Sequence, residues 1–384
     1  MFDVAIAGAG LVGASCALYL KNSGLRLALV ENQEPAWDDQ YNWDKRIYAL
    51  SPGTAAFLRA CGVWQRLDGA RITPITEMQV FGDDGASRLV FSAYDCGLPE
   101  LAFTVENRQL QQLMWQQLAE QQNLTVICPA THQAIEWAAG QIALRLKDGT
   151  HIDARLLVGA DGGDSLVREQ AGILATLHAY RQTAVVANFE AEKAHRNVAY
   201  QWFREDGVLA YLPLSERLIS IVWSTTEDHA QSLIAMEKEQ FCKDVAQAGH
   251  NILGDMRLVS PCATFPLKQL RVERLIGSRV ALIGDAAHIV HPLAGQGVNL
   301  GFQDARILAE TLMNRGVQPD CGDYHLLRRY ERARKEDILA MQLVTHGMQR
   351  LFSSPLLSGL RNFGLRLTNG MPQIKGFLVQ RALN

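Results

Sequence analysis

Three glycines close to the amino terminus are spaced as a phosphate-binding turn requires. Gly8, Gly10 and Gly13 form the sequence GAGLVG, and an acidic residue, Glu31, follows. In a GxGxxG turn the first glycine permits a tight bend, the second lets a pyrophosphate approach the backbone, and the third lets a helix pack on a strand. The helix amides then face the phosphates, and Glu31 can accept from a ribose 2′-hydroxyl, which favours NAD or FAD over NADP.

Such a turn has this meaning only between a buried strand and a helix. Residues 2–7 are a short apolar run typical of a central parallel strand, 14–22 predict a helix, and 25–30 predict a second strand that ends at Glu31. The order strand, turn, helix, strand and acid predicts a βαβ dinucleotide-binding unit. It also argues against a signal peptide or membrane anchor here, because the first charge is acidic and glycines interrupt the apolar run.

Two further carboxylates follow predicted strands much later in the chain. Residues 154–158 precede the sequence GADG with Asp161, and residues 279–283 precede Gly284 and Asp285. Open α/β sheets bind ligands at the carboxyl ends of their strands. A nicotinamide dehydrogenase would continue as regular βαβ units, whereas these sites are far apart in the sequence. Their separation indicates one long ligand crossed by distant segments, as FAD would be.

These motifs together resemble the flavin monooxygenases of the para-hydroxybenzoate hydroxylase fold. The sequence HPLAGQGVNLGFQD at 291–304 is similar in particular to the ubiquinone-biosynthesis hydroxylases. The resemblance extends from residue 3 to about residue 335, and its one departure is GAG where GGG is common. Further matches are RIYALS at 46–51, VENRQL at 105–110, VGADGGDSLVR at 158–168 and RLISIVWS at 217–224.

The resemblance implies FAD as the cofactor and a role for each matching residue. Arg46 would lie beside the flavin and pyrophosphate, Arg108 would neutralise phosphate, and Asp285 would accept from the ribityl hydroxyls. Amides of the loop before residue 299 would face the flavin N1–C2=O edge, which becomes anionic on reduction and is stabilised by a helix amino terminus. Asp161 would touch FAD, although a turn former at a strand end is an alternative. The expected cofactor-binding residues are Gly8, Gly10, Leu11, Val12, Gly13, Glu31, Arg46, Arg108, Asp161, Gly284, Asp285, Gly295, Gln296, Gly297, Val298 and Asn299.

The activity implied is hydroxylation of the aromatic ring of a polyprenylated phenol or quinol precursor in ubiquinone biosynthesis. Reduced FAD and O2 would give a C4a-hydroperoxide, so no side chain is assigned as catalytic, and Pro292, Gly295 and Gly297 would lie beside the ring. The protein must exclude water, and an external reductant, NAD(P)H or a reductase partner, must supply electrons. Two alternatives stay open: a hydroxylase of a soluble phenolic compound, and a non-catalytic flavoprotein in a complex with other ubiquinone-biosynthesis proteins.

The expected fold is α/β: a Rossmann-like FAD-binding domain with an inserted mixed β-sheet substrate domain and a helical C-terminal tail. We expect the FAD-binding domain in 1–72, 102–180 and 270–337, and the substrate domain in 73–101 and 181–269. Alternating apolar residues predict substrate-domain strands at 76–81, 88–91, 183–189, 198–203, 208–213 and 218–224. Some aromatic residues of these strands are candidates for the substrate pocket, but core packing is the commoner fate: Tyr200, Trp202, Tyr211 and Trp223.

Asp285, His288 and His291 form a competing constellation, because two histidines and one carboxylate can ligate iron. Pro292, however, biases His291 away from the helical conformation that would bring both imidazoles to one face. The sequence therefore favours the flavin interpretation and no metal.

Length and composition predict a globular protein of two or three folding units. The chain has 384 residues, 48% of them hydrophobic, and a formal net charge of -3. Mild acidity argues against nucleic acid as a partner. The seven cysteines include no CxxC pair, which fits reduced thiols in the cytoplasm.

The last part of the chain differs from the rest in charge. Residues 338–384 contain five basic residues and no acidic one, whereas the whole chain has 37 basic and 40 acidic residues. Leucines and phenylalanines recur at helix-like intervals between the arginines. The pattern predicts a basic amphipathic helical segment, which can lie on the inner face of an anionic membrane, dock a protein, or pack on the FAD-binding domain.

Overall fold

The structure is a computed structural model that describes residues 1–36, 43–84, 87–291, 297–316 and 320–353, without the side chains of 344–353. Helices and three sheets alternate along the chain, which confirms the predicted α/β class. The α-helices are α1 (Leu11–Tyr19), α2 (Pro52–Ala60), α3 (Asn107–Ala119), α4 (Leu166–Gln170), α5 (Glu227–Ala235), α6 (Lys238–Ala248), α7 (Gly297–Met313) and α8 (Tyr324–Ser353). Short 3-10 helices are η1 (Trp64–Arg66), η2 (Gly69–Arg71), η3 (Tyr94–Cys96) and η4 (Gly284–Ala286).

An eight-stranded sheet brings the predicted strand ends together. Its order is β18 (Ile276–Gly277), β19 (Val280–Leu282), β11 (His151–Gly159), β1 (Phe2–Ala7), β2 (Leu27–Val30) and β8 (Leu124–Ile127), with β9 (His132–Ala138) and β10 (Gln141–Leu146) paired beyond β11. The strands β19, β11, β1 and β2 are parallel. Ala7 pairs with Gly159, and Gly159 with Leu282. The turns after these three residues therefore meet at one edge of the sheet, as the sequence predicted.

Burial of apolar side chains explains this half of the fold. Residues 4–7 of β1 and 27–30 of β2 are at most 1% exposed, and they share one core with residues of α1, α7 and α8. Burial of each large apolar side chain contributes about 1.5–3 kcal/mol. Some predicted bounds were wrong: the helix expected at 14–22 is Leu11–Tyr19, the strand expected at 25–30 is Leu27–Val30, and the strand expected at 279–283 is Val280–Leu282. The strand begins later because Arg279 has a φ of +57°.

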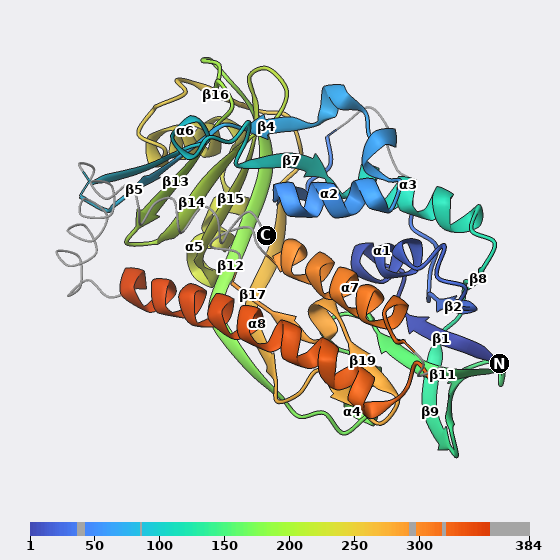
Figure 1. The fold of residues 1–384 in the computed structure, drawn as a ribbon. Helices are drawn as coiled ribbons and strands as arrows, with labels where there is room; N and C mark the ends of the chain where they lie inside the picture. The colour runs from blue at the N-terminus through green and yellow to red at the C-terminus, as the bar shows by residue number, and fades with distance from the viewer. Residues whose placement is uncertain (37–42, 85–86, 292–296, 317–319, 354–384) are drawn as a thin grey trace.

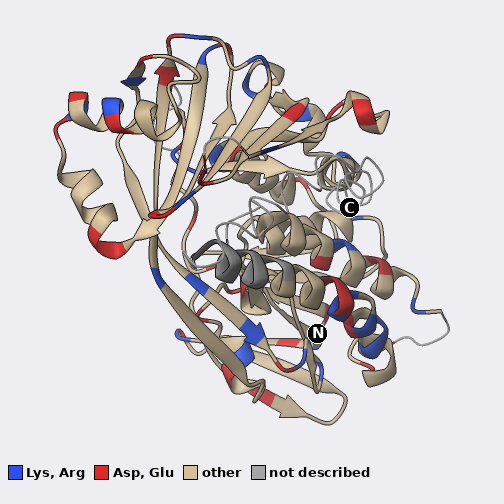
Figure 2. Ribbon diagram, turned by 90° about the vertical axis from the view of Figure 1, so that its left-hand side faces the viewer, with Lys and Arg blue, Asp and Glu red and all other residues tan. Residues whose placement is uncertain are grey.

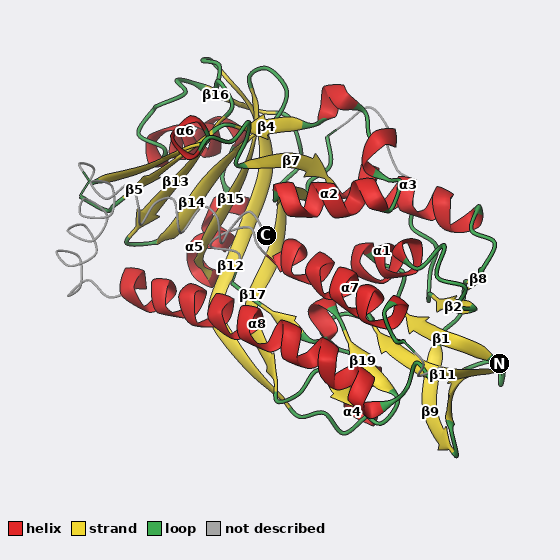
Figure 3. Ribbon diagram, in the orientation of Figure 1, coloured by secondary structure: helices red, strands yellow, loops and turns green. Residues whose placement is uncertain are grey.

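A nine-stranded sheet forms the second large layer (Figures 1 and 3). Its strands pair in the order β20 (His288–Ile289), β17 (Ala263–Val272), β12 (Ala175–Ala191), β15 (Leu218–Thr226), β14 (Gly207–Pro213), β13 (Val198–Arg204), β5 (Glu77–Phe81) and β6 (Arg88–Ser92), with β16 (Met256–Leu258) beside β12. Every substrate-domain strand predicted from alternation is present. In Figure 1 the long strands β12 and β17 extend from this sheet toward the eight-stranded one.

The aromatic residues of the nine-stranded sheet belong to a core of their own. Tyr200, Trp202, Tyr211 and Trp223 are buried together with residues of α5 and α6, which confirms the core interpretation. The Tyr211 hydroxyl donates to the carbonyl of Val245 at 2.5 Å.

A small antiparallel sheet, β3 (Ile47–Leu50), β7 (Ala102–Glu106) and β4 (Thr73–Ile75), completes the fold. Strand β12 passes without interruption through residues 180 and 181, where a domain boundary was expected, with a register shift between Ala179 and Gln182. The domain bounds drawn from the sequence stay a prediction.

Candidate cofactor-binding site

The glycine turn has the shape that a phosphate cradle requires. Gly8 has a φ of +103°, and a Cβ there would lie 2.3 Å from the carbonyl oxygen of Ala160. A Cβ on Gly13 would lie 2.0 Å from the carbonyl oxygen of Gly8, so α1 presses its first turn directly on the loop. Around Gly10 the position of a Cβ meets no atom within 4 Å, and the residue is exposed. Backbone atoms therefore fill the space beside Gly8 and Gly13, whereas the space beside Gly10 is open. A pyrophosphate would approach the amides of α1 on this open side.

Glu31 lies against this cradle. The amide of Ala9 donates to Glu31 Oε2 at 2.6 Å, and the amide of Asn32 donates to Oε1 at 2.7 Å. Trp115 supports the same turn, because its Nε1 donates to the carbonyl of Ala9 at 3.2 Å. The structure thus brings the acid at the end of β2 to the glycine turn, as the βαβ pattern predicted.

Leu11 and Val12 serve the cradle by packing. Leu11 is 8% exposed, within the main core. Val12 lies over Gly284 and Gly301, where added Cβ atoms would come within 3.2 Å and 2.7 Å of its methyl groups. One side chain therefore joins the glycine turn, the turn after β19 and helix α7.

Asp285 is an exposed carboxylate in the turn after β19, between the buried residues Gly284 and Ala286. No hydrogen bond joins its oxygens to any residue in the described part of the chain. Desolvation by neighbouring protein atoms raises the pKa of Asp285, whereas the charges of His288, Arg46 and Lys268 lower it. An acceptor without a protein partner beside the cradle fits the hydroxyls of a ribityl chain.

Asp161, in the turn after β11, has partners within the protein. Ser165 Oγ donates to Oδ1 at 2.5 Å, the amide of Val167 donates to Oδ2 at 3.1 Å, and His132 Nε2 lies 3.3 Å from Oδ2. Burial raises the pKa of Asp161, but the hydrogen bonds from His132 and Ser165 outweigh it and lower that pKa. The geometry is that of a turn former at the start of α4, and its expected contact with FAD stays a prediction.

Arg46 and Arg108 are held by one carboxylate. Asp44 accepts from the backbone amide of Arg46 at 3.1 Å and from that of Arg108 at 2.7 Å. The amide of Asp44 donates to buried Glu106 at 2.7 Å, and Arg71 binds Glu106 through two hydrogen bonds of 2.5 Å and 2.7 Å. This network places both predicted arginines at the start of α3 and β3.

The start of α7 is fixed by Asn299. Its Oδ1 accepts from the amide of Ser51 at 3.0 Å, and its Nδ2 donates to the carbonyl of Ala49 at 2.8 Å. The Asn299 side chain therefore positions the helix, whose first residues are Gly297 and Val298. Pro292, Gly295 and Gln296 lie outside the described residues.

One face of the nine-stranded sheet is turned toward this site. Asn188 Nδ2 donates to the carbonyl of Asp44 at 2.9 Å, and the Arg46 guanidinium lies 4.7 Å from the centroid of the Phe265 ring. Phe265 pairs with Ala184, which shares a face of β12 with Asn188.

The pocket candidates on this face were missed by sequence reasoning. Half-buried Ala210, Leu212 and Val222 alternate with the aromatic core residues of β14 and β15, so they point to the opposite face. The alternation carried this signal, because the neighbours of a core residue in a strand face away from that core. Their small apolar side chains suit an aromatic ring.

The two histidines of the competing metal constellation have separate partners. His288 Nε2 lies 2.6 Å from Asp304, and His291 Nε2 lies 3.1 Å from Gln182 Oε1. Burial lowers the pKa of His291 to about 4. Within the described ranges, no group of three or more His, Cys, Asp or Glu side chains could hold a metal ion.

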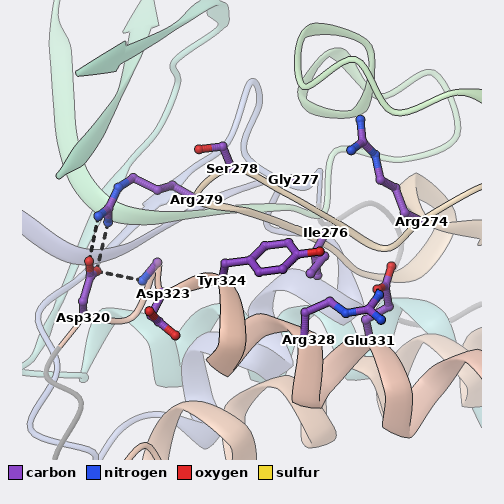
Figure 4. A pocket seen from close by; sticks show the side chains of 11 residues that line it. Arg274, Ile276, Gly277, Ser278, Arg279, Asp320, Asp323, Tyr324, Arg328 and Glu331 are labelled. Atoms are coloured by element: carbon purple, nitrogen blue, oxygen red, sulfur yellow. Dashed lines mark hydrogen bonds and ion pairs between the residues drawn. The ribbon is translucent and has the colours of Figure 1, made fainter. Parts of the chain in front are cut away.

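A cavity of about 430 Å³ lies at the other end of β19 (Figure 4). Arg279, which precedes β19, forms hydrogen bonds of 2.9 Å and 2.7 Å with Asp320, and Arg328 is paired with Glu331. Ligands of open α/β sheets bind at carboxyl ends of strands, whereas this cavity lies at an amino end. Two of its arginines are also paired with acids of the same cavity, so the position and the charges both argue against this cavity as the cofactor site.

An open glycine cradle, an aspartate that accepts no hydrogen bond from the described residues, and a helix start meet at one sheet edge, opposite the half-buried apolar face of a second sheet. This arrangement defines the fold of a flavin-dependent monooxygenase.

Comparisons with known proteins agree with that class. Residues 1–345 match the family model of the FAD binding domain. Ubiquinone hydroxylase UbiL of Rhodospirillum rubrum is 33% identical over 99% of this chain and 89% of its own length. The 3-demethoxyubiquinol 3-hydroxylase of Escherichia coli is 34% identical over 94% of this chain and 93% of its own. PqsL of Pseudomonas aeruginosa, a probable FAD-dependent monooxygenase, has a TM-score of 0.80 at 22% identity, with 95% of this chain and 99% of that one covered. The chain therefore belongs to the family of FAD-dependent ubiquinone hydroxylases, and its cofactor is FAD.

Proposed function

We propose that this protein hydroxylates the aromatic ring of a polyprenylated phenol or quinol precursor of ubiquinone, using FAD, O2 and an external reductant. The observation that carries the proposal is the meeting of the open cradle at Gly10 with the Asp285 carboxylate, which has no hydrogen-bond donor among residues with a described position, opposite a half-buried apolar sheet face. The relatives at 33% and 34% identity, whose names specify ubiquinone hydroxylases, support this substrate class.

The residues of the chain would divide the work of holding the cofactor. Amides of the 8–13 turn would bind the pyrophosphate, Glu31 the adenosine ribose, and Asp285 the ribityl hydroxyls. The first turn of α7 would stabilise negative charge on the reduced ring through its backbone amides and the positive end of the helix dipole. When bound and reduced, FAD supplies the chemistry that activates O2 for transfer of one oxygen atom to an electron-rich ring.

Ala210, Leu212 and Val222 would contact the substrate ring and keep water away from it. Their apolar surface gives no hydrogen bonds to water, and an excluded-water site favours oxygen transfer over unproductive loss of peroxide. Asn188 and Arg46 border the same face and would interact with ring hydroxyls.

The decisive experiment is quinone profiling of a strain that lacks the gene. We expect a polyprenylated intermediate with one hydroxyl group missing to accumulate and the wild-type gene to remove it. The Gly10→Val variant, which has no open cradle, should fail to complement. Normal quinones together with an accumulated soluble phenol would indicate the soluble-substrate alternative instead. Full complementation by a flavin-free variant would indicate a non-catalytic role in a biosynthetic complex.

We further propose a cytoplasmic enzyme that contacts the inner face of the membrane. No helix among the described residues combines the length and apolar character that a bilayer span requires. Three leucines are nevertheless strongly exposed, Leu174 at 70%, Leu177 at 58% and Leu343 at 63%. The carbonyl of Leu270, the strand partner of Leu177, accepts from Gln342 beside Leu343, so α8 contacts the strand that is paired with the segment of Leu177.

Charged residues line the groove between β17 and α8. Its exposed cations are Arg271, Arg274 and Lys335, and it also contains the acids Glu273 and Glu331. Figure 2 shows basic positions along the long strand pair on the face turned to the viewer. Exposed leucines among cations fit the surface of an anionic bilayer, where each cation contributes about 1 kcal/mol. The tail beyond residue 353, with most of its arginines, lies outside the described residues.

Liposome flotation at low salt tests this contact. The parent should float with anionic but not neutral vesicles, and changing Arg350, Arg361 and Arg366 together to Gln should weaken flotation without loss of flavin. A parent that fails to bind anionic vesicles at low ionic strength contradicts the proposal. Loss of thermal stability in the triple variant would indicate packing, and loss of co-purified proteins alone would indicate docking to other ubiquinone-biosynthesis proteins.

A further inference from the structure

A buried carboxylate of α7 holds both ends of the turn that presents Asp285. Asp304 is 0% exposed. Its Oδ2 accepts from the amide of Gly284 at 3.0 Å and lies 2.6 Å from His288 Nε2. Gly284 directly precedes Asp285, and His288 follows it at the start of β20. One buried side chain therefore contacts the turn on both sides of Asp285, which is itself exposed.

The charge of Asp304 is balanced from α8. Arg334 is 1% exposed, and its Nε donates to Asp304 Oδ1 at 2.8 Å. The other guanidinium nitrogens donate to Gln303 Oε1, to the carbonyl of Leu300 and to Asp337. Burial opposes ionisation of Asp304, but His288 and Arg334 outweigh it and lower the pKa of the carboxyl group. A buried ion needs such pairing, since its desolvation otherwise costs several kcal/mol.

Helix α8 also grips the strand that leads into the turn. The Tyr330 hydroxyl, fully buried, donates to the carbonyl of Leu282 at 2.7 Å. Leu282 is the last residue of β19, so α8 fixes the strand end through Tyr330 and the turn through the Arg334–Asp304 pair. The first turn of α7 lies about 10 Å along the same helix from Asp304, at 1.5 Å per residue.

From these contacts we infer that Asp304 is a positioning residue for the cofactor. It sets the distance between the Asp285 carboxylate and the amino terminus of α7, and Arg334 and His288 keep it ionised and in place. An apolar residue at this position would fill the space without bonding to Gly284, and the turn would be free to shift. The inference rests on the proposed FAD contacts of Asp285 and the first turn of α7.

A double-mutant cycle on FAD affinity tests the inference. FAD is titrated into apo-protein of the parent, Asp304→Asn, Asp285→Ala and the double variant. We expect Asp304→Asn alone to weaken FAD binding about tenfold, and to weaken it far less in the Asp285→Ala background, because the two act through one turn. Bound FAD in Asp304→Asn should also show a shifted absorption spectrum. Losses that multiply independently would overturn the inference.

Controls separate positioning from general stability. Asp320→Asn removes a bidentate partner of Arg279 at the amino end of β19, and it should leave FAD affinity unchanged. His288→Gln keeps a donor toward Asp304 and should retain most of the affinity that His288→Ala loses. This pair of variants also decides the matter if Asp304→Asn does not fold, because equal affinities in the two overturn the inference. If Asp285→Ala itself leaves affinity unchanged, the proposed ribityl contact fails, which is a result distinct from an additive cycle.

Discussion

Two aspartates stand at equivalent places in the eight-stranded sheet and have opposite surroundings. Asp161 follows β11, and Asp285 follows the neighbouring parallel strand β19. The protein itself provides donors to both oxygens of Asp161, and its pKa is lowered. Asp285 has no such donor within the described part of the chain, and desolvation raises its pKa. The same local motif therefore gives a carboxylate with protein donors in one turn and, as far as the described residues show, a carboxylate without them in the other.

The difference comes from the element that the chain enters after each turn. After Asp161 the chain enters α4, whose first amides and Ser165 need an acceptor. After Asp285 the chain continues into the short strand β20, and the role of acceptor for the turn amide has passed to Asp304 of α7. An aspartate in the turn after a parallel strand is therefore weak evidence of a ligand site by itself. The evidence is stronger when the folded protein provides no hydrogen-bond donor to its carboxylate.

A substitution in the glycine cradle should weaken FAD binding more than a substitution of either aspartate. Gly10→Val should place a branched side chain in the open space where a pyrophosphate must approach, so the purified protein should contain no FAD. The apo-protein should keep its fold, because no atom lies within 4 Å of the new Cβ. Flavin content by absorbance near 450 nm and thermal unfolding check the two halves of this expectation. Full flavin occupancy would refute the assignment of residues 8–13.

Asp285→Ala should have the next largest effect on the cofactor. A hydrogen bond to a charged group contributes about 1.5–3 kcal/mol, so FAD affinity should fall roughly ten- to a hundredfold. The free energy of unfolding of the apo-protein should not fall, since no residue of the described ranges donates a hydrogen bond to this carboxylate. Titration of apo-protein with FAD and urea unfolding give both numbers. Unchanged affinity would make Asp285 as structural as Asp161.

Asp161→Ala should show the reverse pattern. It removes the acceptor for Ser165, Val167 and His132, and the free energy of unfolding should fall by about 2 kcal/mol or more. FAD affinity, measured on the folded fraction, should change less than in Asp285→Ala. A variant with parental stability and a hundredfold weaker FAD affinity would restore Asp161 to the cofactor site and remove the contrast.

The smallest expected effect of replacing either aspartate is a change in how the stability of the apo-protein depends on pH. The pKa of Asp161 is lowered by folding, so its stabilisation is complete above the ordinary value of about 4 and is lost as pH falls through the lower folded pKa. The pKa of Asp285 is raised, so its cost is present above the raised pKa and disappears as pH falls toward about 4. Urea unfolding of Asp161→Asn and Asp285→Asn should therefore give stability differences from the parent with opposite slopes. Slopes of equal sign would contradict the comparison.

Local patterns made half of this site predictable. The cradle, Glu31 and the turn of Asp285 each consist of a few consecutive residues after an apolar strand. Their partners are distant in the sequence and have no local signal, as with Asn299 and Ala49, 250 residues apart, or Arg334 and Asp304, 30 residues apart. Helix α1 starts three residues before the predicted start because Gly13 tolerates the close approach to Gly8, which depends on the folded turn.

The two faces of the nine-stranded sheet have a consequence for how this protein can change. On one face α5 and α6 seal an aromatic core, whereas the other face carries half-buried Ala210, Leu212 and Val222. Under the proposed function, substitutions of these three residues would alter the space beside the cofactor without removing a side chain of that core. Their effect on substrate preference would then be separable from their effect on the aromatic core.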